Sequence, residues 1–260
     1  MDNDIIFITA YKDIGRNTWH EFNRSNEIYF NNFILLCNNI KYTLLVYIEN
    51  NIREQILMNY SFNTDNIIFK DYHSVSTYLD KYLKNDKIIM SSDIYKDKIP
   101  PHRKNNPEHI YSEYNLVNHN KINFVSDAKK TYPNYAFYSW IDFGYIQDIE
   151  SVPQNINTHA LPHKIIYQCI NIPINYINPN EMLANDIIFI TGSAFIIHRS
   201  LVDYFEIIYE QKIIEWQKNY ISDDDQNLVL QLYYENSHLF HLIQNYTWFL
   251  LYNILPNSIL

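Results

Sequence analysis

The sequence predicts an α/β fold with a mostly parallel central sheet flanked by helices. Short runs of β-branched and aromatic residues alternate along the chain with longer segments in which apolar residues recur at helical spacing. The strand-like runs are apolar throughout, which is typical of strands covered by helices on both faces. Hydrophobic residues make up 47 % of the chain and charged residues 19 %, a composition that favours a large core over disorder.

The alternation of the two patterns gives the expected order of elements. Strands are predicted over 4–9, 42–48, 66–70, 135–142, 164–170 and 186–197, and helices over 24–38, 52–60, 75–84, 108–132, 201–219 and 225–235. A proline-rich loop, 99–107, interrupts the chain without marking a clear domain boundary. We therefore expect one domain over residues 1–260.

Charge and cysteine content restrict the partners and the compartment. The net charge of −9 disfavours nucleic acid as a partner, because binding to phosphate backbones needs a basic face. Cys37 and Cys169 cannot form a disulfide framework, and both lie in apolar runs where buried thiols are expected. The start of the chain is acidic, unlike a signal peptide, and no apolar run reaches the roughly 20 residues of a spanning helix.

These features predict a cytoplasmic protein, in the host cytoplasm if the chain is viral. The apolar stretch 246–255 is too short to span a bilayer, so we expect it to dock on the domain. Weak association with a membrane stays open as the alternative for this stretch.

Glycine is rare, and its three positions mark predicted strand ends. Gly15 and Gly144 follow strand-like runs, and Gly192 interrupts one. Ligands of open α/β sheets bind outside the carboxyl ends of the strands, although ordinary turns or bulges would also use glycine there. No dinucleotide fingerprint, P-loop, GxSxG elbow or zinc motif is present in the sequence.

Two segments carry a resemblance to a known family. The sequences Trp140-Ile141-Asp142-Phe143-Gly144-Tyr145 and Thr9-Ala10-Tyr11-Lys12-Asp13-Ile14-Gly15-Arg16 resemble the HtrL/YibB-like (WlaTC-like) family, whose members look like GT-A-type glycosyltransferases. The resemblance implies a GT-A-like Rossmann-type fold that binds a nucleotide sugar such as a UDP-sugar. It also implies a nucleotide-sugar-binding half, 1–145, and an acceptor-side half, 146–260.

The resemblance implies a donor site at the ends of the strands. Asp142 matches the first acid of the Asp-x-Asp motif of such enzymes, and Gly144 takes the place of the second. Mn²⁺ or Mg²⁺ would then be held by Asp142 with a late His241, since hard cations prefer oxygen ligands. The residues expected to contact the donor are Thr9, Tyr11, Asp13, Gly15, Arg16, Lys121, Asp142 and Gly144.

The acidic triplet at 223–225 is the candidate for general-base chemistry. Either Asp224 or Asp225 would take the proton from the acceptor hydroxyl, with Asp224 favoured, whereas the competing interpretation is a helix cap. The sequence thus predicts a glycosyltransferase acting on a glycan or glycoprotein acceptor. The alternatives are a catalytically silent sugar-binding member of the fold and a metal-dependent phosphohydrolase.

Overall fold

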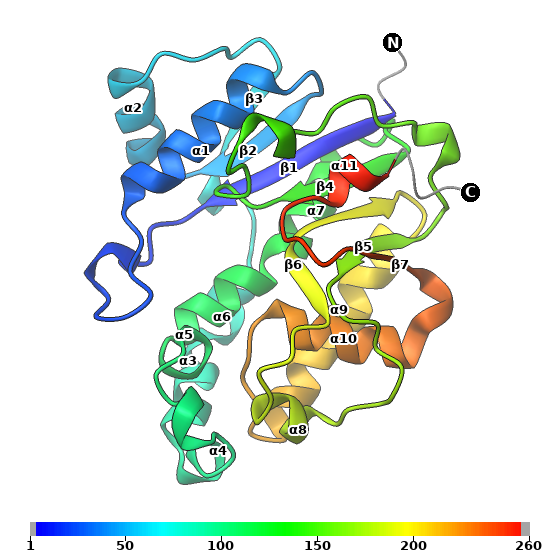
Figure 1. Ribbon diagram of the computed structural model, residues 1–260. Helices are drawn as coiled ribbons and strands as arrows, with labels where there is room; N and C mark the ends of the chain where they lie inside the picture. Colours follow the sequence, from blue (N-terminus) through cyan, green and yellow to red (C-terminus); the bar gives the residue numbers. More distant parts are fainter. Residues whose placement is uncertain (1–3, 256–260) are drawn as a thin grey trace.

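A computed structural model describes residues 4–255 of the chain (Figure 1). Seven strands form one mixed sheet in the order β3-β2-β1-β4-β6-β5-β7. Four of the pairings are parallel, and β6 runs antiparallel to its neighbours β4 and β5. The strands are β1 Ile5–Tyr11, β2 Leu44–Ile48, β3 Ile67–Asp71, β4 Phe137–Ile141, β5 Ile165–Cys169, β6 Ile190–His198 and β7 Phe240–Gln244.

Successive residues of the central strands point to opposite faces and build two cores. Ile6 and Ile8 of β1 belong to one buried cluster, whereas Ile5 and Phe7 belong to the other. Because both faces are covered, the strands are apolar at nearly every position. The predicted α/β class, with a mostly parallel sheet flanked by helices, is confirmed.

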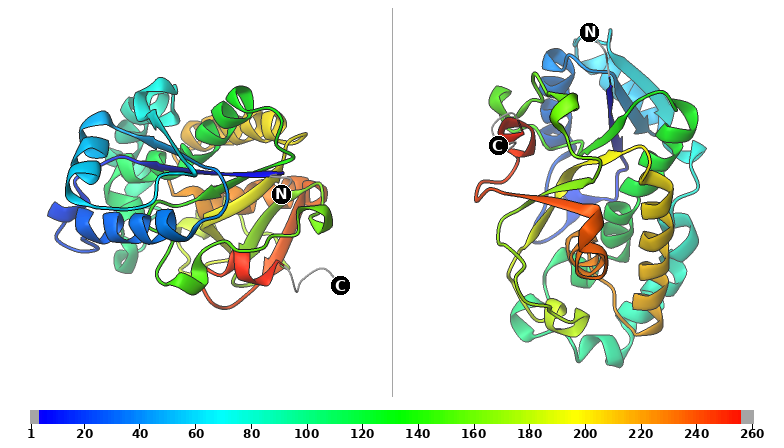
Figure 2. Two further views of the ribbon diagram at one scale, coloured as in Figure 1. Left: turned by 90° about the horizontal axis from the view of Figure 1, so that it is seen from above. Right: turned by 90° about the vertical axis from the view of Figure 1, so that its right-hand side faces the viewer.

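Helices cover both faces of the sheet (Figure 2). Residues of α1, α2 and α11 pack into the core on one face, and residues of α3, α6, α7, α9 and α10 pack into the core on the other. The α-helices are α1 Asn26–Asn39, α2 Asn50–Asn59, α3 Tyr78–Ser91, α4 Asp93–Lys96, α5 Pro107–Ile110, α6 Ser112–His119, α7 Lys121–Thr131, α8 Pro179–Leu183, α9 Val202–Lys218, α10 Asp225–Asn236 and α11 Leu251–Ile254.

The strand order creates a switch point between β1 and β4. From β1 the chain proceeds outward through β2 and β3, and it then returns to the other side of β1 with β4. The connections that leave β1 and β4 therefore diverge and open a crevice at the carboxyl edge of the sheet. This crevice is where the sequence motifs at 9–16 and 140–145 meet.

Several elements differ from the prediction. The helix expected over 108–132 is divided at Tyr111, which is extended, and at Asn120 into α5, α6 and α7. At the second break the Asn120 side chain bonds to the Leu79 amide and to the Tyr72 hydroxyl. The strand expected over 186–197 begins only at Ile190, and residues 186–188 are exposed. The edge strand β7 was not predicted.

The C-terminal segment docks on the domain as expected. Tyr252 of α11 is buried, and its hydroxyl donates to the Trp140 carbonyl oxygen at 2.8 Å. The Leu251 amide donates to the Tyr145 hydroxyl at 3.2 Å. Within residues 4–255, no helix combines the length and the apolar character needed to cross a bilayer.

Candidate functional site

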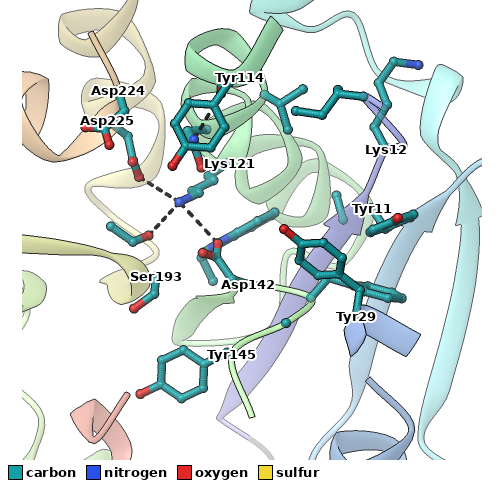
Figure 3. Close-up of a pocket in the computed structure, with 18 of the residues that line it drawn as sticks. Tyr11, Lys12, Tyr29, Tyr114, Lys121, Asp142, Tyr145, Ser193, Asp224 and Asp225 are labelled. Atoms are coloured by element: carbon teal, nitrogen blue, oxygen red, sulfur yellow. Dashed lines mark hydrogen bonds and ion pairs between the residues drawn. The ribbon is translucent and has the colours of Figure 1, made fainter. Parts of the chain in front are cut away.

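A cleft of about 260 Å³ lies at the switch point, beyond the ends of β1 and β4. One side consists of residues from the segment after β1 and from α1, and the other of residues from α7, β4, β6 and the start of α10. We call the first side, formed by Tyr11, Lys12, Asp13, Arg16, Arg24 and Tyr29, the loop wall. The second side, formed by Lys121, Asp142, Ser193, Asp224 and Asp225, is the acidic wall (Figure 3).

A buried lysine organises the acidic wall. The Lys121 ammonium lies 2.9 Å from Asp225 Oδ2 and 3.2 Å from Asp142 Oδ1, and it donates to the Gly192 carbonyl oxygen at 2.8 Å. The side chains of Lys121 and Asp225 are each 6 % exposed, whereas that of Asp142 is 34 % exposed. Asp142 is therefore the carboxylate of this triad that a ligand in the cleft can contact.

Burial and ion pairing act in opposite directions on these groups. Burial lowers the pKa of the Lys121 ammonium, but the carboxylates of Asp142 and Asp225 outweigh burial, so the net pKa is raised. Burial raises the pKa of Asp142, and Lys121 together with the Trp140 indole opposes that rise. The Trp140 Nε1 donates to Asp142 Oδ1 at 2.7 Å, which fixes the carboxylate beside the ammonium.

Gly192 is required by the close approach of Asp225. A Cβ atom at position 192 would lie 2.7 Å from Asp225 Cγ and still closer to the carboxylate oxygens. Gly192 also supplies a carbonyl oxygen to Lys121, and its neighbour Ser193 accepts from the Asp142 amide at 2.9 Å. Gly192 thus allows β6 to lie close to both Asp225 and Lys121.

Asp224 lies at the mouth of the acidic wall and also caps α10. Its Oδ1 accepts from the Gln226 amide at 3.1 Å, so the capping interpretation of the triplet is realised. Burial raises the pKa of Asp224, and its neighbours Asp223 and Asp225 add to the rise. Burial likewise raises the pKa of Asp223 to about 7. A carboxylate with a raised pKa is a stronger base at neutral pH.

The loop wall presents cations and aromatic rings. Arg16 Nη1 donates to the Tyr29 hydroxyl at 2.9 Å, and the Arg24 guanidinium lies 5.3 Å from the centre of the Tyr29 ring. Within residues 4–255, neither arginine pairs with a carboxylate, so both retain free donors. Lys12, by contrast, is paired with Glu49 at 2.9 Å.

Two further glycines shape the loop wall. A Cβ atom at Gly144 would lie 2.8 Å from Cδ1 of the Tyr29 ring, so the glycine lets this ring pack over the strand end. Gly15 adopts a φ of 73°, in the left-handed region, and its amide donates to Asp13 Oδ1 at 2.8 Å. The other oxygen of Asp13 accepts from Asn26 at 2.9 Å, which ties the loop to α1.

The structure brings most of the predicted site residues together. The residues that line the cleft are Tyr11, Asp13, Arg16, Lys121, Asp142, Gly144, Asp224 and Asp225. Thr9 does not line the cleft, because its side chain is fully buried within β1. Gly15 shapes the turn and does not line the cleft either. Lys121, which was expected to contact the donor from a long helix, lines the cleft and is buried between two carboxylates.

The structure does not bring the two predicted metal ligands, Asp142 and His241, together. His241 lies on β7, which is three strands away from β4, a separation on the order of 14 Å at the usual strand spacing. The Lys121 ammonium occupies the position between Asp142 and Asp225 that a cation would take. Among the residues that the structure describes, no group of three or more His, Cys, Asp or Glu side chains is arranged to hold a metal. These residues do not fit the implied ion.

Sequence reasoning missed several residues of the cleft. Arg24 and Tyr29 lie beyond the matched motif, and Tyr114 lies on α6. Trp140 was part of the motif but was assigned no role, although its indole holds Asp142. The signal for Arg24 was its position at the start of a predicted helix, directly after the loop that contains Arg16.

Comparison with known proteins gives one family. A family model described as "Bacterial protein of unknown function (HtrL_YibB)" matches residues 3–256. Protein HtrL of Escherichia coli (strain K12) is 23 % identical over 257 residues, covering 93 % of this chain and 88 % of that protein. A solved structure of 4-diphosphocytidyl-2C-methyl-D-erythritol synthase from Anaerococcus prevotii DSM 20548 aligns over 93 % of this chain and 88 % of its own, with 10 % identity and a TM-score of 0.38. With a match along nearly its whole length, the chain belongs to the HtrL/YibB family.

Proposed function

We propose that this protein transfers a sugar from a nucleotide-sugar donor to a hydroxyl group of a glycan or protein-linked acceptor. The observation that carries the proposal is the polarity of the cleft at the switch point, where arginines without an acidic partner line one wall and Lys121, Asp142 and Asp225 line the other. A nucleotide sugar has the matching polarity, since an anionic diphosphate joins a neutral sugar to an aromatic base. The proposal thus goes beyond the family, whose function is unknown.

Charge decides how the donor would lie. The two carboxylates and one ammonium of the triad leave one net negative charge, which repels a diphosphate. Arg16 and Arg24 on the loop wall have the planar donors that fork onto phosphate oxygens. The diphosphate would therefore contact the loop wall, with the base against Tyr11 or Tyr29 and the sugar directed toward Asp142.

The reaction assigns a role to the acidic wall. The acceptor oxygen forms a bond to the anomeric carbon of the sugar, and the bond from that carbon to the diphosphate oxygen breaks. Asp224 takes the acceptor proton, and the nucleoside diphosphate leaves with the electron pair of the broken bond. Asp224 suits this role better than Asp225, whose carboxylate is buried and engaged by Lys121.

A second candidate function is binding without turnover. It is favoured by one observation, namely that Asp142 already accepts from both Lys121 and Trp140. Such a protein would bind nucleotide sugars or glycans and release no nucleotide. The two candidates differ in whether free nucleoside diphosphate appears.

Calorimetry with UDP-, GDP-, dTDP- and CMP-sugars tests the proposal, followed by an assay for released nucleotide. We expect one nucleotide class to bind, and Asp142→Asn to abolish release while the protein stays folded. Asn at this position can still accept from Trp140, so a residue with only a structural role would tolerate the change. If no member of the panel binds, the proposed function is wrong.

Dependence of donor binding on a divalent cation is a separate prediction. The resemblance implies Mn²⁺ or Mg²⁺, yet the described side chains around Asp142 do not fit it. The calorimetry is therefore run once with Mn²⁺ and once with a chelator. Unchanged donor affinity in the chelator would indicate that the protein side chains alone hold the diphosphate.

A further inference from the structure

A second cavity adjoins the cleft at its acidic end. It encloses about 310 Å³ and is lined by residues of α5, of the segment 185–189 and of the start of α10. Four residues, Arg16, Tyr114, Asp224 and Gln226, line both spaces. A ligand in the second cavity can therefore contact Asp224, as can a ligand in the cleft.

A buried arginine builds one wall of this cavity. The Arg103 guanidinium donates to the carbonyl oxygens of Met182 at 2.9 Å and Leu183 at 3.0 Å, and it also bonds to the Asn185 carbonyl oxygen. It pairs with Glu108 at 2.9 Å and with Asp186 at 3.3 Å. Since Arg103 is 6 % exposed, its bonds to the three carbonyl oxygens are shielded from water and fix the segment that faces α10.

The rim of the cavity exposes apolar side chains. Phe22 is 51 % exposed, Ile187 50 % and Ile188 38 %, and all three line the cavity. Phe22 has a φ of 56°, an uncommon value for a bulky residue, and Arg16 Nε donates to its carbonyl oxygen at 3.1 Å. Backbone strain of this kind persists where the surroundings enforce it, and it clusters at ligand sites. The strained turn holds an aromatic ring at the rim.

We infer that the second cavity binds the acceptor, a neutral saccharide whose hydroxyl group reaches Asp224. The inference rests on the proposed function. A saccharide presents C–H faces, which pack on Phe22 and Ile188, and hydroxyl groups, which bond to carboxylates and amides such as those of Asp224 and Gln226.

Charge restricts the acceptor to saccharides without acidic groups. The carboxyl groups that line the cavity are those of Glu108, Asp186, Asp223 and Asp224, and the cations are Arg16 and Arg103. Arg103 is already engaged by Glu108 and Asp186, so its charge is not free for a ligand. An acidic sugar would meet four carboxyl groups and one arginine without an acidic partner, Arg16, and this excess of negative charge lowers its affinity relative to a neutral sugar.

Saturation-transfer NMR on the full chain without donor tests the inference. The probes are the methyl β-glycosides of glucose, galactose and N-acetylglucosamine, with methyl β-glucuronide as the acidic counterpart. We expect binding of a neutral glycoside and a weaker signal from the glucuronide. Phe22→Asn should weaken neutral-glycoside binding about tenfold. Asn tolerates the left-handed backbone, so this variant removes the ring and spares the turn.

Two further variants and one parallel measurement make the result decisive. Phe22→Tyr should retain binding, and Met58→Ala, on the exposed surface of α2, should leave it unchanged. Nucleotide affinity, measured by calorimetry, should be unaltered in Phe22→Asn. Nucleotide binding without any glycoside binding, or a glycoside signal that survives Phe22→Asn, overturns the inference and leaves the proposed function standing. Glycoside binding that depends on Phe22 without nucleotide binding supports the saccharide site and refutes the transferase.

Discussion

The two walls of the cleft are built on different physical principles. In the acidic wall, Lys121 and Asp225 are almost fully buried, and each charged group has a charged or hydrogen-bonding partner. In the loop wall, Arg16 and Arg24 are partly exposed and lie against aromatic rings. The acidic wall is thus satisfied before any ligand arrives, whereas the loop wall keeps donors available for one.

This difference suggests that the two walls have different roles, one in the chemical step and the other in binding. A preorganised, water-excluded set of charges serves a chemical step, because it needs no reorganisation as the reaction proceeds. Partly exposed cations on a loop serve binding, because they adjust to a ligand at small cost in stability. We therefore expect changes in the acidic wall to affect folding and rate, and changes in the loop wall to affect donor affinity.

The largest expected effect follows from removing the buried ammonium. Lys121→Met leaves the carboxylates of Asp142 and Asp225 without their common partner, which should destabilise the fold by about 3–5 kcal/mol. Urea unfolding measures the change. The matched control is Lys129→Met on the same helix, whose partner Asp203 is 63 % exposed and whose loss should cost under about 1 kcal/mol. Equal effects of the two substitutions would refute a buried triad.

The ionisation of Asp223, which directly precedes Asp224 of the acidic wall, should make the free energy of unfolding depend on pH. Burial raises the pKa of Asp223 from 3.8 to about 7, so the folded state holds this proton more tightly than the unfolded chain does. The free energy of unfolding therefore falls as pH rises from about 4 to about 7, by at most about 4 kcal/mol. Asp223→Asn removes this loss.

The test of this ionisation is a pair of unfolding curves at each pH. Relative to the unmodified protein, Asp223→Asn should be similar in stability at pH 4 and more stable at pH 8. Asn can still accept one of the two hydrogen bonds that Asp223 receives from the Asp224 amide and Asn227. A stability difference that does not change with pH would mean that Asp223 is ionised throughout.

Much of this architecture was predictable because local patterns suffice for it. The apolar runs are buried at every position of β2 and at every position of β1 except Ala10, and such strands can be predicted from composition alone. The positions of Asp142 and Asp13 followed from strand ends, since parallel strands bring their carboxyl ends to one edge. These features depend on residues that are near one another in the sequence.

The parts that could not be predicted depend on contacts between distant segments. Lys121 and Asp225 are 104 positions apart, and no local pattern reveals that they form a pair. The break at Asn120, which orients Lys121, is held by Tyr72 and Leu79 from another part of the chain. His241 looked like a ligand in the sequence, but the strand order places it at the far edge of the sheet.

Glycine substitutions compare the rigidity of the two walls directly. Gly192→Ala places a methyl group against the Asp225 carboxylate, which Lys121 holds in position, and should cost about 1–3 kcal/mol. Gly144→Ala meets the partly exposed Tyr29 ring, which can turn away, and should cost about 1 kcal/mol or less. Thermal unfolding of both variants gives the comparison. A larger loss for Gly144→Ala would reverse the assignment of the rigid wall.

The smallest effect on folding is expected for Arg24→Gln in the loop wall. Arg24 is partly exposed and contacts Tyr29 through its guanidinium, so its loss should change stability by under about 0.5 kcal/mol. Donor affinity, in contrast, should fall about ten- to hundredfold, because a hydrogen bond to a charged phosphate contributes about 1.5–3 kcal/mol. The matched substitution is Asp224→Asn, which preserves the cap of α10 and should lower the transfer rate by roughly 10²–10⁴ with donor affinity unchanged. Calorimetry with the donor and steady-state kinetics on both variants separate the two walls. If Arg24→Gln lowers kcat and leaves donor affinity intact, the arginine acts in the chemical step, and the division between a binding wall and a reacting wall fails.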